Sequence, residues 1–432
     1  MAGARALGAA LAATACLFAV SGLAPSSSAD DLSPSAPAGT ACDPGVVRYI
    51  SQTPSAVAQL GMEQAWALST GAGVVVAVVD SGVSGDNAHF PTSGDSPALL
   101  PGIDLVSGGE GRQDAYGHGT EVAGEIAARE VEGSGLVGLA PDAQILPVRV
   151  YASTSDDDQR AGNGPTPDRI AQGIRWAADQ GAAVIVVALS TAEDVSALRE
   201  AVAYAQSEGS LIVASVGNVS DDPDAPEDQP RYPAGYPGVI GVGSLDADGL
   251  PSDNSVQGPH VSIAAPGLSV ITTYFGAGDC MVSNDAPSTS FATGYVAGIA
   301  ALVASRHPDE TVDDWRYRLL ETASRPVAQE RDNAIGWGIV SPVAALSFVN
   351  DGSGVGPDNP RYPGAAQPGP APTLEPAIAE STPDSVKLAV GIVFLAGVVV
   401  LACGLLFARI SSRRSSRISS RRSSRRRRRA GT

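Results

Sequence analysis

The sequence predicts an α/β fold in which a parallel sheet is flanked by helices on both faces. Short apolar runs recur along the chain, and segments of helical length separate them. The run at 74–79 contains only Val and Ala, which is typical of a strand buried on both faces. Further strands are expected at 145–150, 183–189, 211–216 and 239–242, and helices at 120–129, 168–180, 192–208 and 291–306.

Segments of different composition precede and follow this domain, which is expected over 62–350. Residues 1–29 carry an early arginine, an apolar run and a small, polar end, which is the order of a secretory signal peptide. An uncleaved membrane anchor is the alternative interpretation. Residues 30–61 are expected to form an N-terminal arm. Residues 351–386, rich in Pro, Gly and Ala, predict an extended spacer.

An uncharged apolar stretch at 388–408 predicts one C-terminal transmembrane helix, with bounds at 387–409. It is long enough to cross about 30 Å of hydrocarbon. The arginine-rich tail at 410–432 is expected to stay cytoplasmic, which puts the large domain outside the cytoplasm on a single-pass anchor. The tail is interpreted as a stop-transfer signal that binds anionic lipids, and docking of a cytoplasmic partner is the alternative.

The charge distribution argues against nucleic acid as a partner. The formal net charge is −18, and the last 24 residues hold eleven arginines without any acidic residue. The preceding part of the chain is therefore strongly acidic, and it would repel phosphates.

The four cysteines divide by location. Cys16 lies in the expected signal peptide and Cys403 in the expected membrane span. Cys42 and Cys280 remain in the exported part, where an even pair suggests a disulfide. Two free thiols are the competing interpretation.

Three short polar segments carry the candidate chemistry. Asp80 follows the first buried strand, His118 lies between two glycines where a helix begins, and Ser290 opens another helix. Each has a bland explanation alone, because a turn aspartate, a structural histidine and a helix-capping serine are all common. Together they supply the carboxylate, base and nucleophile that acyl transfer needs.

The residues around these three groups resemble the subtilase family of serine peptidases. The matching segments are 73–83, 117–124 and 288–298, in the order Asp, His, Ser that is found in subtilisin. The resemblance covers about 62–349. It implies a subtilisin-like fold and an endopeptidase whose catalytic triad is Asp80, His118 and Ser290, with protein or peptide substrates.

The same resemblance implies two further roles. Asn218 matches the asparagine that donates to the oxyanion, although an Asn that merely ends a strand in a turn is the alternative. The segment Ala188, Leu189, Ser190 matches the strand that lines the substrate cleft, where an extended peptide would add as a strand.

Two positions depart from the family pattern. Ser288 stands where glycine is usual, and Gly294 stands where proline is usual. The first adds a side chain beside the nucleophile, and the second is expected to loosen the helix slightly. Neither removes a reacting group, so the fold is expected to be unaffected while turnover is open to question.

The order of segments resembles the mycosins, which are membrane-anchored subtilases associated with type VII secretion systems of actinobacteria. This resemblance implies limited proteolysis of secreted substrates and support of the secretion complex. The alternatives are a weak or inactive scaffold of that complex and a general nutrient-degrading protease. No cofactor is expected to be required, and the sequence leaves structural calcium open.

Overall fold

The structure is a computed structural model that describes residues 42–219 and 229–364, together with Leu395, Val399 and Leu401. The expected signal peptide at 1–29 and cytoplasmic tail at 410–432 lie outside these residues, as does nearly all of the expected span at 387–409. Within the described residues no helix has the length and apolarity needed to cross a membrane.

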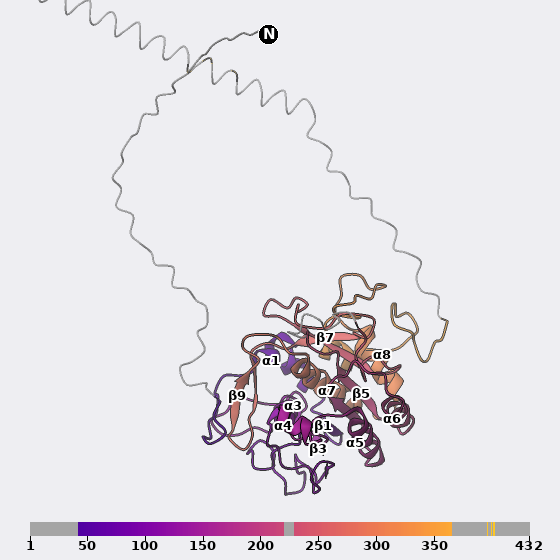
Figure 1. The fold of residues 1–432 in the computed structure, drawn as a ribbon. Helices are drawn as coiled ribbons and strands as arrows, with labels where there is room; N and C mark the ends of the chain where they lie inside the picture. The colour runs from indigo at the N-terminus through magenta and orange to yellow at the C-terminus, as the bar shows by residue number, and fades with distance from the viewer. Residues whose placement is uncertain (1–41, 220–228, 365–394, 396–398, 400, 402–432) are drawn as a thin grey trace, which may run out of the picture. The chain divides into compact units, whose positions relative to one another are not determined.

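A seven-stranded parallel sheet forms the centre of the domain, as predicted (Figure 1). Its strands lie in the order β2-β3-β1-β4-β5-β6-β7. The register places Val76 of β1 beside Ile145 of β3 and Val184 of β4. The bounds are β1 Val75–Asp80, β2 Ile103–Asp104, β3 Gln144–Arg149, β4 Val184–Val187, β5 Leu211–Ser215, β6 Ile240–Leu245 and β7 Ile263–Pro266.

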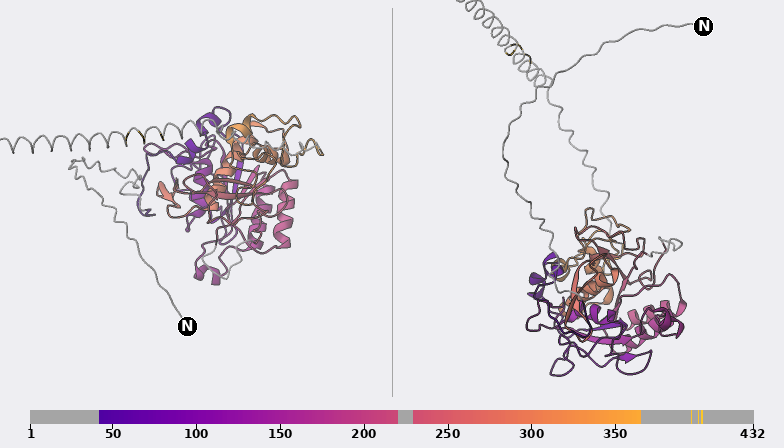
Figure 2. Two further views of the ribbon diagram at one scale, coloured as in Figure 1. Left: turned by 90° about the horizontal axis from the view of Figure 1, so that it is seen from above. Right: turned by 60° about the vertical axis from the view of Figure 1, so that its left-hand side comes forward.

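Helices cover both faces of the sheet, so the central strands β4 and β5 are buried on both sides. Val76 and Val78 of β1 join the core beneath α3 (His118–Ala127) and α7 (Thr289–Arg306). The alternate residues Ala77 and Val79 join the core beneath α5 (Pro167–Asp179) and α6 (Ser196–Ser207). Figures 1 and 2 show α5 and α6 side by side, with α7 across the strands from them.

Several short elements were not predicted from the sequence. An antiparallel hairpin, β8 (Val270–Thr273) and β9 (Asp279–Val282), packs beside α3. A short helix, α4 (Asp156–Arg160), forms between β3 and α5, where the Ser155 hydroxyl accepts from the Asp158 N–H. The remaining helices are α1 Ser55–Gln59, α2 Met62–Trp66, α8 Val312–Glu321 and α9 Pro342–Ser347.

The beginning of the expected spacer packs against the domain and does not extend away from it. Arg361 donates from Nε to Asp314 on α8 at 2.6 Å. The Val355 N–H donates to Glu321 at the end of the same helix at 2.9 Å. Proline and glycine content alone indicated an extended segment, but these paired polar groups fix residues 351–364 on the surface.

The described part of the N-terminal arm lies along the β8–β9 hairpin. Arg48 forms a parallel bridge with Gly278, and its carbonyl accepts from the Asp279 N–H at 2.8 Å. The Ile50 N–H donates to the Asp279 carboxylate at 2.9 Å. The arm therefore contributes to the edge of the domain that also carries Cys280.

Candidate active site

Asp80 and His118 meet where β1 ends and α3 begins. Asp80 Oδ1 lies 2.8 Å from His118 Nδ1. The Asp80 side chain is fully buried, whereas the imidazole is 19% exposed. The Asp80 carboxylate therefore contacts the His118 ring from the interior of the protein. The other ring nitrogen, His118 Nε2, faces away from the carboxylate.

The side chain of Asp80 is positioned by two neighbouring groups, and the sequence did not reveal either contact. The buried Tyr151 hydroxyl donates to Asp80 Oδ1 at 2.9 Å, and the Ser81 N–H donates to the same oxygen at 2.7 Å. Tyr151 directly follows the predicted strand at 145–150, but a tyrosine at a strand end has no distinctive signal. Its contact with Asp80 depends on the pairing of β1 with β3.

Asp114 organises the first turn of α3. Its carboxylate accepts from the Gly117 N–H at 2.7 Å and from the Thr120 N–H at 2.9 Å. Gly117 adopts a φ of 98°, and a Cβ there would come within 2.8 Å of the Phe275 ring. Glycine before His118 is therefore required by both backbone conformation and space.

The acidic surroundings hold His118 toward its charged form. Burial lowers the pKa of His118, but the carboxylates of Asp80, Glu121 and Asp114 outweigh it and raise the pKa to about 9. Burial raises the pKa of Glu121 to about 7, against the opposing charge of His118. His118 is therefore largely protonated at neutral pH in the free protein.

Ser290 lies in the first turn of α7, close to the imidazole. The ring centroids of His118 and of Phe291, the residue after the nucleophile candidate, are 6.0 Å apart. Ser290 Oγ donates to the Ala188 carbonyl at 2.9 Å. Within the described residues the Ser290 hydroxyl has no hydrogen bond to His118, so the structure joins Asp80 to His118 and leaves the third group directed elsewhere.

Asn218 packs against the start of α7. Its Oδ1 accepts from both the backbone N–H and the hydroxyl of Thr289, each at 3.0 Å. These two bonds fix the amide orientation, so Nδ2 faces the N-terminal turn of α7 and donates to Ser288 Oγ at 3.4 Å. An amide held in this way can donate to an anionic oxygen near Ser290.

The predicted cleft segment follows β4 directly. Ala188 is buried, and its carbonyl accepts the Ser290 hydroxyl. Leu189 and Ser190 are half-buried and lie outside the strand. Thr191 then pairs with Tyr232 in an isolated antiparallel bridge.

A second His–Asp pair lies away from these groups and is structural. His89 Nε2 lies 2.7 Å from Asp279 Oδ1, and both side chains are fully buried. The Ser134 hydroxyl donates to the Asp279 carboxylate at 2.6 Å, so it faces the acid and not the imidazole. The pair joins the β8–β9 hairpin to the rest of the domain.

Cys42 and Cys280 form a disulfide, with Cα atoms 5.6 Å apart and a sequence separation of 238. It ties the arm to β9 beside the bridge made by Arg48. Within the described residues, no group of three or more His, Cys, Asp and Glu side chains is arranged to hold a metal ion.

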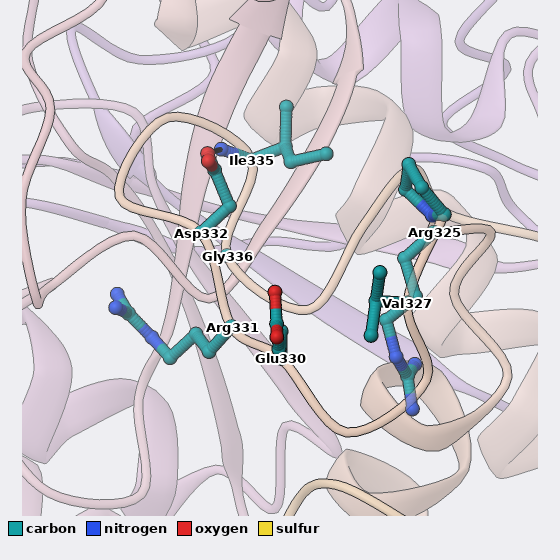
Figure 3. Close-up of a pocket in the computed structure, with 8 residues that line it drawn as sticks. Arg325, Val327, Glu330, Arg331, Asp332, Ile335 and Gly336 are labelled. Carbon is teal, nitrogen blue, oxygen red and sulfur yellow. Dashed lines mark hydrogen bonds between the residues drawn. The ribbon is translucent and has the colours of Figure 1, made fainter. Parts of the chain in front are cut away.

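A pocket separate from these groups lies in the loop after α8 (Figure 3). Arg331 Nη2 donates to the carbonyls of Gly258 and Val261, and Arg325 donates to carbonyls at the end of α8. Both arginines are thus bonded to the domain's own backbone. None of the candidate catalytic residues lines this pocket; its lining residues are Arg325, Pro326, Val327, Glu330, Arg331, Asp332, Ile335 and Gly336.

The fold and this set of polar groups agree with the comparisons to known proteins. The model of the subtilase family matches residues 71–338, which include every residue of the candidate triad. The chain therefore belongs to the subtilase family of serine peptidases.

Within that family the similarity to mycosins spans most of the chain. Mycosin-3 of Mycobacterium tuberculosis is 34% identical over 395 residues, which cover 80% of this chain and 80% of the relative. Thermitase of Thermoactinomyces vulgaris is 37% identical over 258 residues, covering 60% of this chain and 84% of the relative. A crystal structure of MycP1 with its N-terminal propeptide removed superposes with a TM-score of 0.59 at 34% identity, covering 70% of this chain and 99% of that chain. The chain is accordingly a subtilase of the mycosin type.

Proposed function

We propose that this protein is a membrane-anchored, extracytoplasmic serine endopeptidase in which Asp80, His118 and Ser290 act as a catalytic triad. The single observation that carries the proposal is the 2.8 Å contact between Asp80 and His118 Nδ1. A buried carboxylate at this nitrogen fixes the tautomer that leaves Nε2 free to accept a proton. Ser290, at the start of a helix beside the ring, is the hydroxyl that this base would serve.

The reaction divides into two acyl transfers. Ser290 Oγ attacks the peptide carbonyl carbon while His118 Nε2 takes the hydroxyl proton. The C–N bond breaks, the amine leaves with that proton, and an acyl ester remains on Ser290. Water then attacks the ester, with His118 again taking and returning the proton, and the carboxylic acid is released.

The hydroxyl of Ser290 must first leave the Ala188 carbonyl, to which it donates at 2.9 Å. A rotation about χ1 of Ser290 redirects the hydroxyl without moving the backbone. Neutral His118 then offers an acceptor that the protonated ring lacks. Rotation and deprotonation of the imidazole are therefore coupled steps of activation.

Substrate is proposed to bind along Ala188, Leu189 and Ser190. These residues continue from β4 beyond the end of its pairing with β5, and Leu189 and Ser190 are only half-buried. An extended peptide would add there as a further strand, with its scissile carbonyl next to Ser290. Asn218 Nδ2 and the Ser290 N–H would donate to the oxygen of that carbonyl.

The biological setting we propose is a type VII secretion system. A solved relative with a TM-score of 0.59 and 32% identity is described as the MycP3 protease from the type VII (ESX-3) secretion system. The expected signal peptide and span would hold the catalytic domain outside the cytoplasm, near such a complex. Its substrates would be secreted proteins, cleaved at limited sites.

A fluorophosphonate probe tests this proposal on the full-length chain in isolated membranes. Labelling of the wild-type protein is expected, and Ser290→Ala should abolish it. His118→Ala should reduce labelling by orders of magnitude without unfolding the domain, because the triad acts as a unit. Ser134→Ala is the matched control, because it removes the hydroxyl that donates to Asp279 of the structural His–Asp pair. This variant should label as wild type does.

The alternative is an inactive scaffold of the secretion complex, for which the serine at position 288 is the supporting observation. Absence of labelling in a folded wild-type protein would favour the scaffold. A general nutrient-degrading protease would instead be released from the membrane and would cleave casein at many sites.

A further inference from the structure

Ser288 Oγ bridges the two groups that would bind an oxyanion at Ser290. Asn218 Nδ2 donates to this oxygen at 3.4 Å, and the Ser290 backbone N–H donates to it at 3.3 Å. An acceptor atom shared by both donors lies where the negative oxygen of a tetrahedral intermediate would need to lie. We propose that the Ser288 hydroxyl occupies the oxyanion hole of the resting enzyme and is displaced during acylation. The inference rests on the function proposed above.

The local structure explains how Ser288 can hold this position and leave it. Ser288 is the N-cap of α7, with an extended backbone at φ −120° and ψ 131°. A serine at an N-cap directs its oxygen toward the free N–H groups of the first turn. The side chain is only half-buried, so a change of rotamer can move the oxygen away from α7 while the backbone stays in place.

The strengths of the competing hydrogen bonds set the direction of the exchange. Both bonds to Ser288 Oγ are long, and the oxygen is neutral. A developing oxyanion forms shorter, charge-assisted bonds with the same donors, roughly twice as strong. Displacement of Ser288 Oγ from the two donors is therefore favoured only once negative charge develops on a well-placed substrate carbonyl. Ser288 consequently slows acylation by substrates that are poorly positioned.

Glycine at position 288, which the family pattern favours, would leave both donors open. Serine at position 288 should consequently slow the chemical step more than it weakens substrate binding. Ser288 is in this sense a positioning residue that acts through Asn218 and the Ser290 N–H. It controls turnover without taking part in bond making.

The experiment compares wild type, Ser288→Gly and Ser288→Ala in the full-length chain, with the fluorophosphonate labelling rate and peptide turnover as readouts. Both variants are expected to label about 3- to 30-fold faster, because two weak competing hydrogen bonds are removed. The gain should appear in kcat, with KM nearly unchanged. Equal or slower labelling in both variants would overturn the proposal.

Thr311→Ala is the matched control, since Thr311 caps α8 with a side-chain hydrogen bond outside the site. It should lower thermal stability as loss of a cap does, while leaving the labelling rate at the wild-type value. If Thr311→Ala also labels faster than wild type, the faster labelling reflects a general loosening of the domain. That result would overturn the role of Ser288.

The outcomes separate this inference from the proposed function. Wild-type labelling that Ser290→Ala abolishes, together with unaccelerated Ser288 variants, would overturn the inference alone. Absence of labelling in wild type and in both Ser288 variants would overturn the proposed function. Labelling that appears only in Ser288→Gly and Ser288→Ala would support both, with the hole fully closed in the resting protein.

Discussion

The carboxyl group of Glu125 on α3 occupies the space that a side chain at Gly294 on α7 would need. A Cβ built on Gly294 would overlap with Glu125 Oε2. Glu125 is 1% exposed, and neither carboxyl oxygen has a hydrogen-bond partner within the described residues. Burial raises the pKa of Glu125 well above its usual value, which favours the neutral acid.

This relationship changes the interpretation of Gly294. Glycine in place of the family's proline was expected to loosen the start of the helix. Yet α7 runs without interruption from Thr289 to Arg306, and position 294 is fully enclosed. Glycine is needed at 294 because Glu125 fills the neighbouring space, so the two residues form a matched pair.

The first prediction concerns that pair. Gly294→Ala should lower the free energy of unfolding by about 1 to 3 kcal/mol, because the added methyl group overpacks a closed site. Urea unfolding followed by tryptophan fluorescence measures the change. In a Glu125→Ala background the same substitution should cost much less, and strictly additive effects would contradict the contact.

The second prediction concerns pH. Because a general base must be neutral, kcat/KM should rise about tenfold per pH unit up to the His118 pKa of about 9 and then level off. The same shift affects stability with the opposite sign. A raised pKa contributes stability that is fully present below the ordinary value of 6.5 and is lost as pH rises through about 9.

Glu121→Gln tests the cause of the shift. Glu121 is one of the carboxylates that raise the pKa of His118, so its neutralisation should move the activity profile to lower pH and increase turnover at pH 7. Glu130→Gln is the control, because Glu130 is exposed just beyond α3. A profile unchanged in Glu121→Gln, or equally displaced in both variants, would rule out this role for Glu121.

The sequence was sufficient to indicate the candidate catalytic residues but not how their side chains are held. Asp80, His118 and Ser290 stand in short segments whose local pattern is distinctive. The hydroxyl of Tyr151 reaches Asp80 only because β1 and β3 pair in one particular register. Likewise, Ser288 receives the Asn218 amide across a gap of 70 positions in the chain, which no local pattern encodes.

The fold shows the same division. Strands buried on both faces, such as β1, are predicted by a continuous apolar, β-branched run. The β8–β9 hairpin contains polar residues whose partners lie elsewhere: Thr272 and Thr273 hydroxyls donate to carbonyls of α3. The hairpin was not predicted, although residues 270–273 are all β-branched, and these tertiary contacts hold it beside α3.

The third prediction concerns Tyr151. Tyr151→Phe removes one donor to Asp80 Oδ1, while the bonds from Ser81 and His118 remain. Looser positioning of the carboxylate should lower kcat by about tenfold, the effect of one hydrogen bond to a charged group. Tyr204→Phe is the control, since its hydroxyl donates to Asp179 between α5 and α6. Wild-type turnover in Tyr151→Phe would show that the hydroxyl has no positioning role.

The fourth prediction concerns the disulfide between Cys42 and Cys280, which closes a loop with a sequence separation of 238. Reduction should lower the free energy of unfolding by about 2 to 4 kcal/mol, because the unfolded chain regains the freedom that the cross-link removes. Unfolding of the full-length protein with and without reductant gives this difference. The Cys42→Ser/Cys280→Ser variant should already have the lower stability and should not respond to reductant.

Reduction should also release the arm before the domain unfolds. In addition to the disulfide, backbone hydrogen bonds of Arg48 and a hydrogen bond from the Ile50 N–H to the Asp279 carboxylate hold the arm near Cys280. Amide hydrogen exchange should therefore increase first at residues 42–50 and only slightly in β1, which lies in the centre of the sheet. Equal protection of the arm in oxidised and reduced protein would mean that these bonds alone hold it, and that the disulfide acts only on the unfolded chain.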